Sequence, residues 1–516
     1  MNTRSAVIRN TLFSSVGIYT EYFLGMLTSI IIARHLGPAD FGAYSLVVWL
    51  VATGVAITNS GVASAVIKFV AELRGGGQEA RIRSLLAWAW KVQAGFLAVV
   101  LLAGTALFLL QGERVMPDFN HGILLAILVA TTILRSLYMF NIGVAKGYEN
   151  FRATAVVAAV AAPVNLVLIL AAWWLDGSME WFLGVFTVSS LVFWWISRVQ
   201  VAKLLPPRQP REPLDADMRR RLRSYTALVA VTVAVTFVTA SEVEVLFLSM
   251  FDSAASAGQF KVAFQLASGA ALLVPGVFGA LLLPMMANAL SQGHAVANRR
   301  LAMSTSYLAA LAAPLVAFGV VFAQPIIALL YGAEYAPAAL AFAFCLAALS
   351  LTTLSQGASS YLLGADRQRA LMVIVLVCAL VKVALDVVLI RAYGLHGAIA
   401  AFTATSALAA LAVIALALRY SGARLQWPRL ARIAMAAAIA GAGAWLVDGH
   451  LPPLPTLLLG GPVLAVLYGL ATLALGCWSM SDIDHFRTLH ERFGRGRVRA
   501  LGRLLDWAER RAGSAA

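Results

Sequence analysis

Charged and amide side chains within or at the ends of apolar stretches are the residues of this chain that could do chemistry. Burying a charge among apolar neighbours is costly, so such a residue normally faces a partner or a water-filled path. The candidates for a functional role among them are Glu21, Arg34, Lys91, Arg135, Asn165, Glu242, Glu244, Lys382 and Asp386, and the same stretches also hold Asn59, Asn141 and Lys261.

The cationic and amide members are candidates for contact with a solute: Arg135, Lys382, Lys91, Asn165 and Arg34. Arg135 lies about halfway along its apolar stretch, too deep for the guanidinium to reach water easily, so we expect it to face a cavity. Lys91 lies about two turns into its stretch, where a long side chain can instead extend back to the surface.

The acidic members, Glu21, Glu242, Glu244 and Asp386, are candidates for coupling to H⁺ or Na⁺. Glu242 and Glu244 are two residues apart and point to roughly opposite sides of a helix, so at most one faces a cavity. Lys382 and Asp386 are four apart on one helical face, and both an intrahelical pair and a solute site remain open.

The composition shows what positions these residues. The chain is 61% hydrophobic and 12% charged, whereas a soluble domain is about half apolar and a quarter charged. Stretches long enough to span a bilayer recur throughout, which predicts an all-α polytopic membrane protein. We expect about 14 transmembrane helices, at 10–33, 43–66, 84–110, 121–145, 153–175, 181–200, 225–250, 258–288, 302–324, 336–363, 370–390, 396–418, 431–449 and 457–478.

The sequence also repeats itself. A shift of 217 places Gly147, Arg152, Ala153, Val164 and Gly177 on Gly364, Arg369, Ala370, Val381 and Gly394, and Asn165 on Lys382. A shift of 216 places 42–44 on 258–260. Internally repeated membrane proteins are commonly transporters whose path lies between the repeats. We expect an N-lobe at 1–205, a basic proline-rich linker at 206–223, a C-lobe at 224–420, an added helix pair at 421–478 and a basic tail at 479–516.

Charge distribution predicts the orientation. Most of the 39 Lys and Arg residues fall in loops on one side of the fourteen-helix topology, which puts both termini in the cytoplasm. The net charge of +15 therefore indicates contact of the tail with anionic lipid and no nucleic acid. The three cysteines show neither metal spacing nor a disulfide framework, and we expect them to be packing residues.

Several signals of enzymes are missing from the sequence. There is no phosphate-binding loop ending in Gly-Lys-Ser/Thr and no His-Glu-x-x-His. Every predicted external loop is short, the longest being near 111–120. We expect no enzymatic activity, no metal and no cofactor beyond H⁺ or Na⁺.

Four segments resemble a known family. Residues 31–44 (IIARHLGPADFGAY) resemble the signature of the first helix hairpin of Wzx-type polysaccharide flippases in the multidrug/oligosaccharidyl-lipid/polysaccharide exporter superfamily. Residues 68–72 (KFVAE), 329–338 (LLYGAEYAPA) and 393–398 (YGLHGA) resemble later elements of that family. The resemblance spans the first twelve predicted helices.

The resemblance implies a MATE/MurJ-like fold and alternating access that carries undecaprenyl-diphosphate-linked oligosaccharide across the bacterial inner membrane for O-antigen, capsule or exopolysaccharide synthesis. Polysaccharide polymerase and chain-length proteins would be partners. Alternatives are a lipid II flippase and a drug/cation antiporter of the same superfamily. The alternative of another class is a membrane glycan polymerase, ligase or glycosyltransferase, which would need a large external loop.

Overall fold

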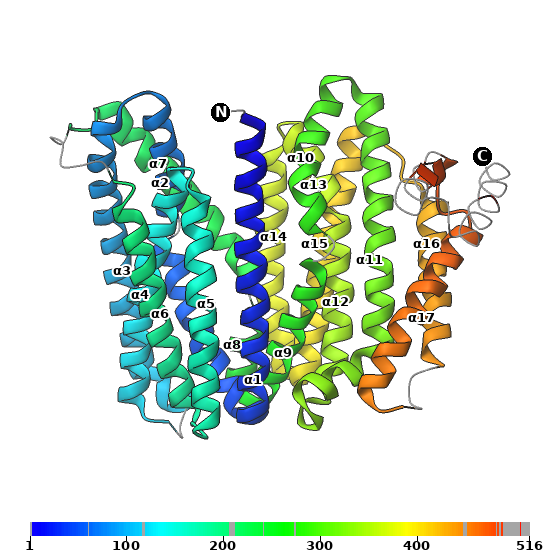
Figure 1. The fold of residues 1–516 in the computed structure, drawn as a ribbon, viewed down its shortest axis with the longest axis horizontal. Helices are drawn as coiled ribbons and strands as arrows, with labels where there is room; N and C mark the ends of the chain where they lie inside the picture. Colours follow the sequence, from blue (N-terminus) through cyan, green and yellow to red (C-terminus); the bar gives the residue numbers. More distant parts are fainter. Residues whose placement is uncertain are drawn as a thin grey trace. The chain divides into compact units, whose positions relative to one another are not determined.

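The computed structural model describes residues 3–59, 61–115, 119–205, 212–240, 242–272, 275–446, 451–480, 482–484, 487–488 and 506. At 3–18, 21, 113–115, 234–236, 238–240 and 275–281 it describes the backbone alone. All regular structure within these ranges is helical (Figure 1). Helices satisfy their own backbone hydrogen bonds, which apolar stretches require inside a membrane.

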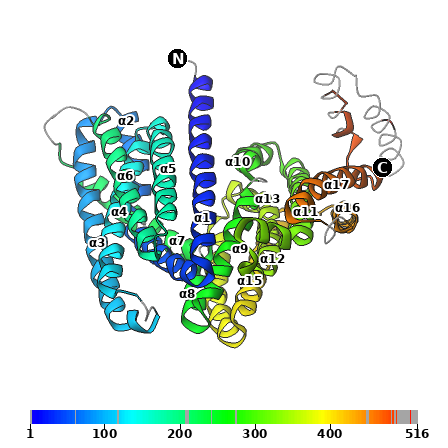
Figure 2. The same cartoon turned by 60° about the horizontal axis from the view of Figure 1, so that its bottom comes forward.

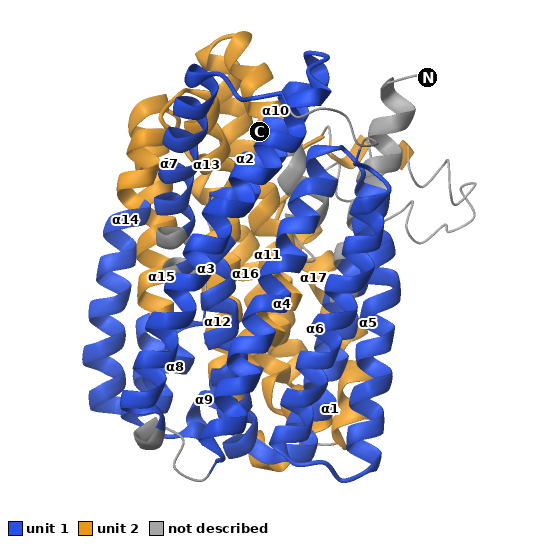
Figure 3. Ribbon diagram, turned by 90° about the vertical axis from the view of Figure 1, so that its left-hand side faces the viewer, with its two compact units in different colours: residues 1–262, 375–401 blue, residues 263–374, 402–516 orange. Residues whose placement is uncertain are grey.

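Contacts divide the chain into two compact units (Figure 3). Unit 1 comprises residues 1–262 and 375–401, and unit 2 comprises residues 263–374 and 402–516. These boundaries do not follow the two repeats expected from the sequence. The assignment of the repeats to two lobes therefore stays a prediction.

Unit 1 contains α1 (Thr3–Asn59), α2 (Val62–Gly75), α3 (Glu79–Val115), α4 (His121–Gly147), α5 (Phe151–Trp174), α6 (Met179–Ala202), α7 (Ala216–Ala240), α8 (Val243–Phe251) and the first part of α9 (Ala254–Leu272). It also takes the second part of α14 (Gln368–Leu385), the π-helical turn η2 (Asp386–Ile390) and the first part of α15 (Arg391–Ser421). Helices α4, α5 and α6 pack against one another (Figures 1 and 2).

Unit 2 holds the remaining parts of α9, α14 and α15. Its other elements are α10 (Pro275–Ser291), α11 (His294–Tyr331), the 3₁₀ turn η1 (Ala333–Tyr335), α12 (Ala338–Leu354), α13 (Gln356–Gly364), α16 (Trp427–Trp445) and α17 (Pro453–Ala474). The last two correspond to the predicted added pair, and both contact α11.

Nine helices in the described part of the chain are long and apolar enough to cross a membrane, so the all-α polytopic class is confirmed but the number of 14 spans is not. Part of the difference arises because some neighbouring predicted spans are joined into one continuous helical segment. The predicted spans 10–33 and 43–66 share α1, which runs through a non-helical residue at Gly37 (φ 73°). The spans 370–390 and 396–418 are likewise joined through Gly394 (φ 54°).

The predicted span 43–66 is interrupted, because α1 ends at Asn59 and α2 begins at Val62. Gly61 lies at this break with φ of +74°. A Cβ there would overlap the carbonyl oxygen of Thr226 on α7. Position 61 therefore requires glycine for two reasons, the left-handed backbone conformation and the close approach of α7.

Part of the predicted linker is structured. Helix α7 begins at Ala216, inside the segment 206–223, because Leu214 and Leu222 are buried in the core of unit 1 with α2 and the start of α3. Arg81 on α3 bonds Asp215 at 2.7 Å, which fixes the same segment at the surface. The end of the linker is thus attached to unit 1.

Candidate functional site

A buried cluster of charges joins α8 to the end of α14. Lys382 forms an ion pair with Glu244 on α8, and its ammonium nitrogen lies 3.6 Å from a carboxylate oxygen of Asp386 on η2. The three side chains are 0–3% exposed. The sequence predicted the pair between Lys382 and Asp386, which is present. The partner Glu244 was not predicted.

The cluster is not balanced. It holds two carboxylates and one ammonium group. Glu244 Oε2 and both carboxylate oxygens of Asp386 have no hydrogen-bond partner among the described residues, although all three atoms are buried. Buried polar atoms without partners are rare and often mark function. The arrangement can accept one further small cation.

The local backbone is unusual where Asp386 lies. The helix widens to a π-helical turn over Asp386–Ile390 directly after α14. Such turns are rare and occur mostly at functional sites. The following residue with positive φ, Gly394, packs on the Asp252 carboxylate, which accepts a hydrogen bond from the Leu395 amide at 3.1 Å.

Glu242 has a different partner from Glu244. It pairs with Lys261 on α9, and these two side chains are 16% and 20% exposed. The sequence placed both glutamates in one helix, but Glu242 precedes α8 with a non-helical ψ of 58° and only Glu244 lies in the helix, so their separate partners do not follow from helical spacing. Only Glu244 belongs to the buried cluster.

Arg135 lines a cavity of about 580 Å³ within unit 1. Its Nε donates to the hydroxyl of Ser190 at 2.9 Å, and its guanidinium lies over the rings of Phe186 and Phe193. Residues of α1, α4, α5 and α6 form the walls, and Lys146 adds a second cation. The stacked rings position a planar group that can bind two oxygens of one anion.

The structure places Lys91, Arg34 and Asn165 neither in the Lys382 cluster nor on the wall of the Arg135 cavity. Lys91 on α3 and Arg34 in α1 are exposed, and Asn165 on α5 is half-buried. No contact joins Asn165 to its repeat equivalent Lys382 in the described part of the chain. The side chain of Glu21 lies outside the described residues.

Two interactions that sequence analysis missed lie at nearly equivalent positions under the shift of 217. His35 contacts the backbone carbonyl of Gly177 at 3.0 Å through Nε2, after the first helical stretch. The equivalent position, Asp252, accepts a hydrogen bond from the amide of Leu395, one residue beyond Gly394, which is the equivalent of Gly177. The shift of 217 relates these two positions, but His35 and Asp252 differ in residue type, so comparison of the repeats by sequence did not pair them. These paired contacts support the duplication.

The repeats also meet through glycines. A Cβ on Gly42 would overlap the carbonyl oxygen of Ala254, and a Cβ on Gly258 would overlap that of Pro38. The shift of 216 relates Gly42 to Gly258 and Pro38 to Ala254, so the contact is reciprocal. Only glycine permits this close approach of two main chains.

The helices, buried charges and cation-lined cavity together define a multi-pass membrane protein. Among known sequences, a family described as polysaccharide biosynthesis protein matches residues 7–290, more than half of the chain. The chain belongs to that family. No curated protein sequence matches it.

Solved structures agree with the fold. The chain is similar to the lipid II flippase MurJ in an inward closed conformation, with a TM-score of 0.69 and 14% identity over 90% of this chain and 99% of that one. It is similar to an inward-facing multidrug resistance MATE transporter of the MOP superfamily, with a TM-score of 0.64 and 12% identity over 79% and 98%.

A MOP superfamily transporter from Pyrococcus furiosus is a third similar structure, with a TM-score of 0.55 and 14% identity over 81% and 95%. At these identities the likeness shows the fold. The resemblance to the exporter superfamily inferred from the sequence and the MATE/MurJ-like architecture are both confirmed. These neighbours are transporters or flippases rather than enzymes.

Proposed function

We propose that this protein is a flippase that moves undecaprenyl-diphosphate-linked oligosaccharide across the bacterial inner membrane by alternating access. The observation that carries the proposal is Arg135 on the wall of the unit 1 cavity, in a chain of a polysaccharide biosynthesis family. A guanidinium binds phosphate oxygens in a bidentate manner. Both termini would lie in the cytoplasm, and the exported glycan would pass to a polysaccharide polymerase and chain-length proteins.

The buried cluster around Lys382 is the proposed coupling site. With one carboxylate more than ammonium groups, it can take up one H⁺ or Na⁺ from one side of the membrane and release it on the other. A change in its net charge would alter the attraction between α8 and the α14–η2 junction. Transport driven by an ion gradient needs such a charge-dependent contact.

The test uses a host lacking this protein, with glycan synthesis initiated normally. Polyprenyl-linked oligosaccharides are extracted after a membrane-impermeant reagent has been added outside. Complete repeat units that accumulate and stay shielded are expected, with relief by the wild-type protein but not by Arg135→Ala. Arg152→Ala is the matched control, because Arg152 is an exposed arginine on α5 that does not line the cavity.

Other outcomes would overturn the proposal. Complete units that accumulate but react with the external reagent would place the defect after translocation, as expected for a polymerase or ligase. Shielded lipid II in place of the oligosaccharide would support a lipid II flippase. Normal glycan lipids with lost drug or cation export would support the antiporter alternative.

A further inference from the structure

Unit 2 contains a cavity that the proposed function does not use. It lies between α10 and α11 and has a volume of about 670 Å³. Leu282 and Leu308 from the two helices are buried together beside it. The walls are mostly apolar and include Leu282, Met285, Val296, Met303, Leu308 and Leu311.

Two consecutive arginines line the same cavity. Arg299 and Arg300 are exposed, and neither has an ion-pair or hydrogen-bond partner among the described residues. Some other surface arginines are neutralised, as Arg81 is by Asp215 and Arg221 by Glu72. The cavity therefore combines apolar walls with two uncompensated positive charges.

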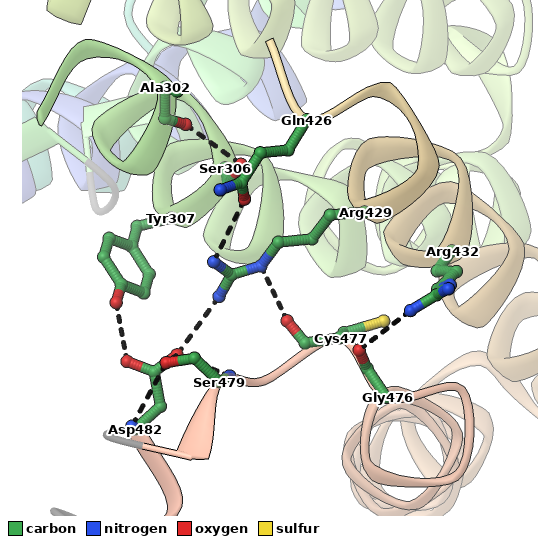
Figure 4. Close-up of polar contacts among 10 residues, drawn as sticks. All are labelled: Ala302, Ser306, Tyr307, Gln426, Arg429, Arg432, Gly476, Cys477, Ser479 and Asp482. Atoms are coloured by element: carbon green, nitrogen blue, oxygen red, sulfur yellow. Dashed lines mark hydrogen bonds and ion pairs between the residues drawn. The ribbon is translucent and has the colours of Figure 1, made fainter. Parts of the chain in front are cut away.

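A side chain on the wall of this cavity bonds a carboxylate that is itself neutralised. Tyr307, which lines the cavity, donates its hydroxyl to Asp482 at 2.6 Å (Figure 4). Asp482 also accepts hydrogen bonds from Arg429 at 3.2 Å and from the Ser479 hydroxyl at 2.7 Å (Figure 4).

The charge state of Asp482 follows from these contacts. Burial alone would raise the pKa of Asp482, but the bonds from Ser479 and Tyr307 and the nearby Arg429 outweigh it and hold the pKa below its usual range. Asp482 therefore stays ionised as the partner of Arg429. It does not offset the charge of Arg299 and Arg300.

We propose that this cavity binds an anionic phospholipid of the cytoplasmic leaflet. Its phosphate would lie against Arg299 and Arg300, and one acyl chain would lie against the apolar side chains of α10 and α11. A cation beside apolar walls matches a molecule with an anionic head and a hydrocarbon chain. The cytoplasmic side follows from the basic loop at 291–300, so this part of the inference rests on the proposed topology.

The test measures lipid binding by the purified full-length protein in detergent. Phosphatidylglycerol is titrated while the midpoint of thermal unfolding is followed, and bound lipid is counted by native mass spectrometry. The midpoint should rise with phosphatidylglycerol but not with phosphatidylcholine. The double variant Arg299→Gln/Arg300→Gln loses two charge-assisted hydrogen bonds. This loss should weaken the binding of phosphatidylglycerol by about tenfold or more.

Two further variants separate the cavity from general surface charge. Arg220→Gln/Arg223→Gln removes the same charge from exposed arginines outside the cavity and should bind as the wild type does. Met303→Trp leaves both arginines in place but fills part of the cavity, and it should also lose the lipid.

Equal binding by Arg299→Gln/Arg300→Gln and the wild type would overturn the proposal. So would displacement of the lipid by inorganic phosphate alone, which would show a simple anion site. Displacement by undecaprenyl phosphate at equal concentration would reassign the cavity to the transported lipid. These measurements use no transport, so their failure is distinct from failure of the proposed flippase activity.

Discussion

Replacement of Lys382 by methionine tests whether the buried cluster is held together by its single ammonium group. Among the described residues, the change removes the only cation paired with Glu244 and Asp386, whose side chains are 0% exposed. Removing one partner of a buried ion pair costs about 3–5 kcal/mol. We expect Lys382→Met to lose that much stability, which is two to nearly four orders of magnitude in the unfolding equilibrium.

Two matched variants test whether the loss comes from the unbalanced negative charge that Lys382→Met leaves behind. Asp386→Asn leaves the pair of Glu244 and Lys382 with no net charge and should cost less than about 1–2 kcal/mol, because it removes the excess negative charge. The triple variant Glu244→Gln/Lys382→Met/Asp386→Asn carries no charge. It should recover most of the loss, since neutral replacements of buried ion pairs are often tolerated.

The chain provides its own probe for this measurement. Cys378 lies one helical turn before Lys382 on α14 and is 5% exposed, while Cys345 and Cys477 in unit 2 are 0% and 3% exposed. Thiol labelling followed by mass spectrometry reports opening at each cysteine. In Lys382→Met, Cys378 should react at lower denaturant than the other two.

Unchanged protection of Cys378 in Lys382→Met would refute this reasoning. A loss in Asp386→Asn as large as that in Lys382→Met would do the same, because it would mean that Asp386 is a required partner rather than an excess charge.

The other predictions concern the glycine contact and the C-terminal segment. Gly42→Ala should abolish transport while the protein still folds, because the new methyl group overlaps the Ala254 carbonyl. Gly25→Ala, with open space around its Cβ position, should be neutral. Equal transport by both variants would contradict a role for the close approach at Gly42. The lowered pKa of Asp482 means that its stabilising contacts are complete above the ordinary value of about 3.9 and are lost as pH falls through the lower folded-state value. The protection factors of the amides at 476–480, which are corrected for the intrinsic pH dependence of exchange, should therefore fall in acid in the wild type, whereas Asp482→Asn should lack this fall.

Residue spacing and position within apolar stretches predicted several of the local contacts and breaks. The four-residue spacing of Lys382 and Asp386 gives their contact directly. The break at Gly37 follows from the polar interval between two apolar stretches. The depth of Arg135 in its stretch led to its expected place on a cavity wall.

Long-range contacts were beyond these patterns. Glu244 and Lys382 are 138 residues apart, and nothing in either local sequence selects the other. The break between α1 and α2, where Gly61 lies, falls inside an apolar stretch, and α7 approaches the chain closely at Gly61. Lys91 was expected either to contact a solute or to extend back to the surface, and its side chain is exposed on α3, most of which is exposed. Position along the sequence of α3 did not determine which way Lys91 faces.

The reciprocal contact at Gly42 and Gly258 has a consequence for its sensitivity to pH and salt. The nearest atoms on both sides of this crossing are main-chain atoms, and main-chain amide and carbonyl groups carry no titratable charge. A change in pH or salt therefore does not alter the atoms that make this contact. A substitution at either glycine would alter it, because the added Cβ would overlap a carbonyl oxygen.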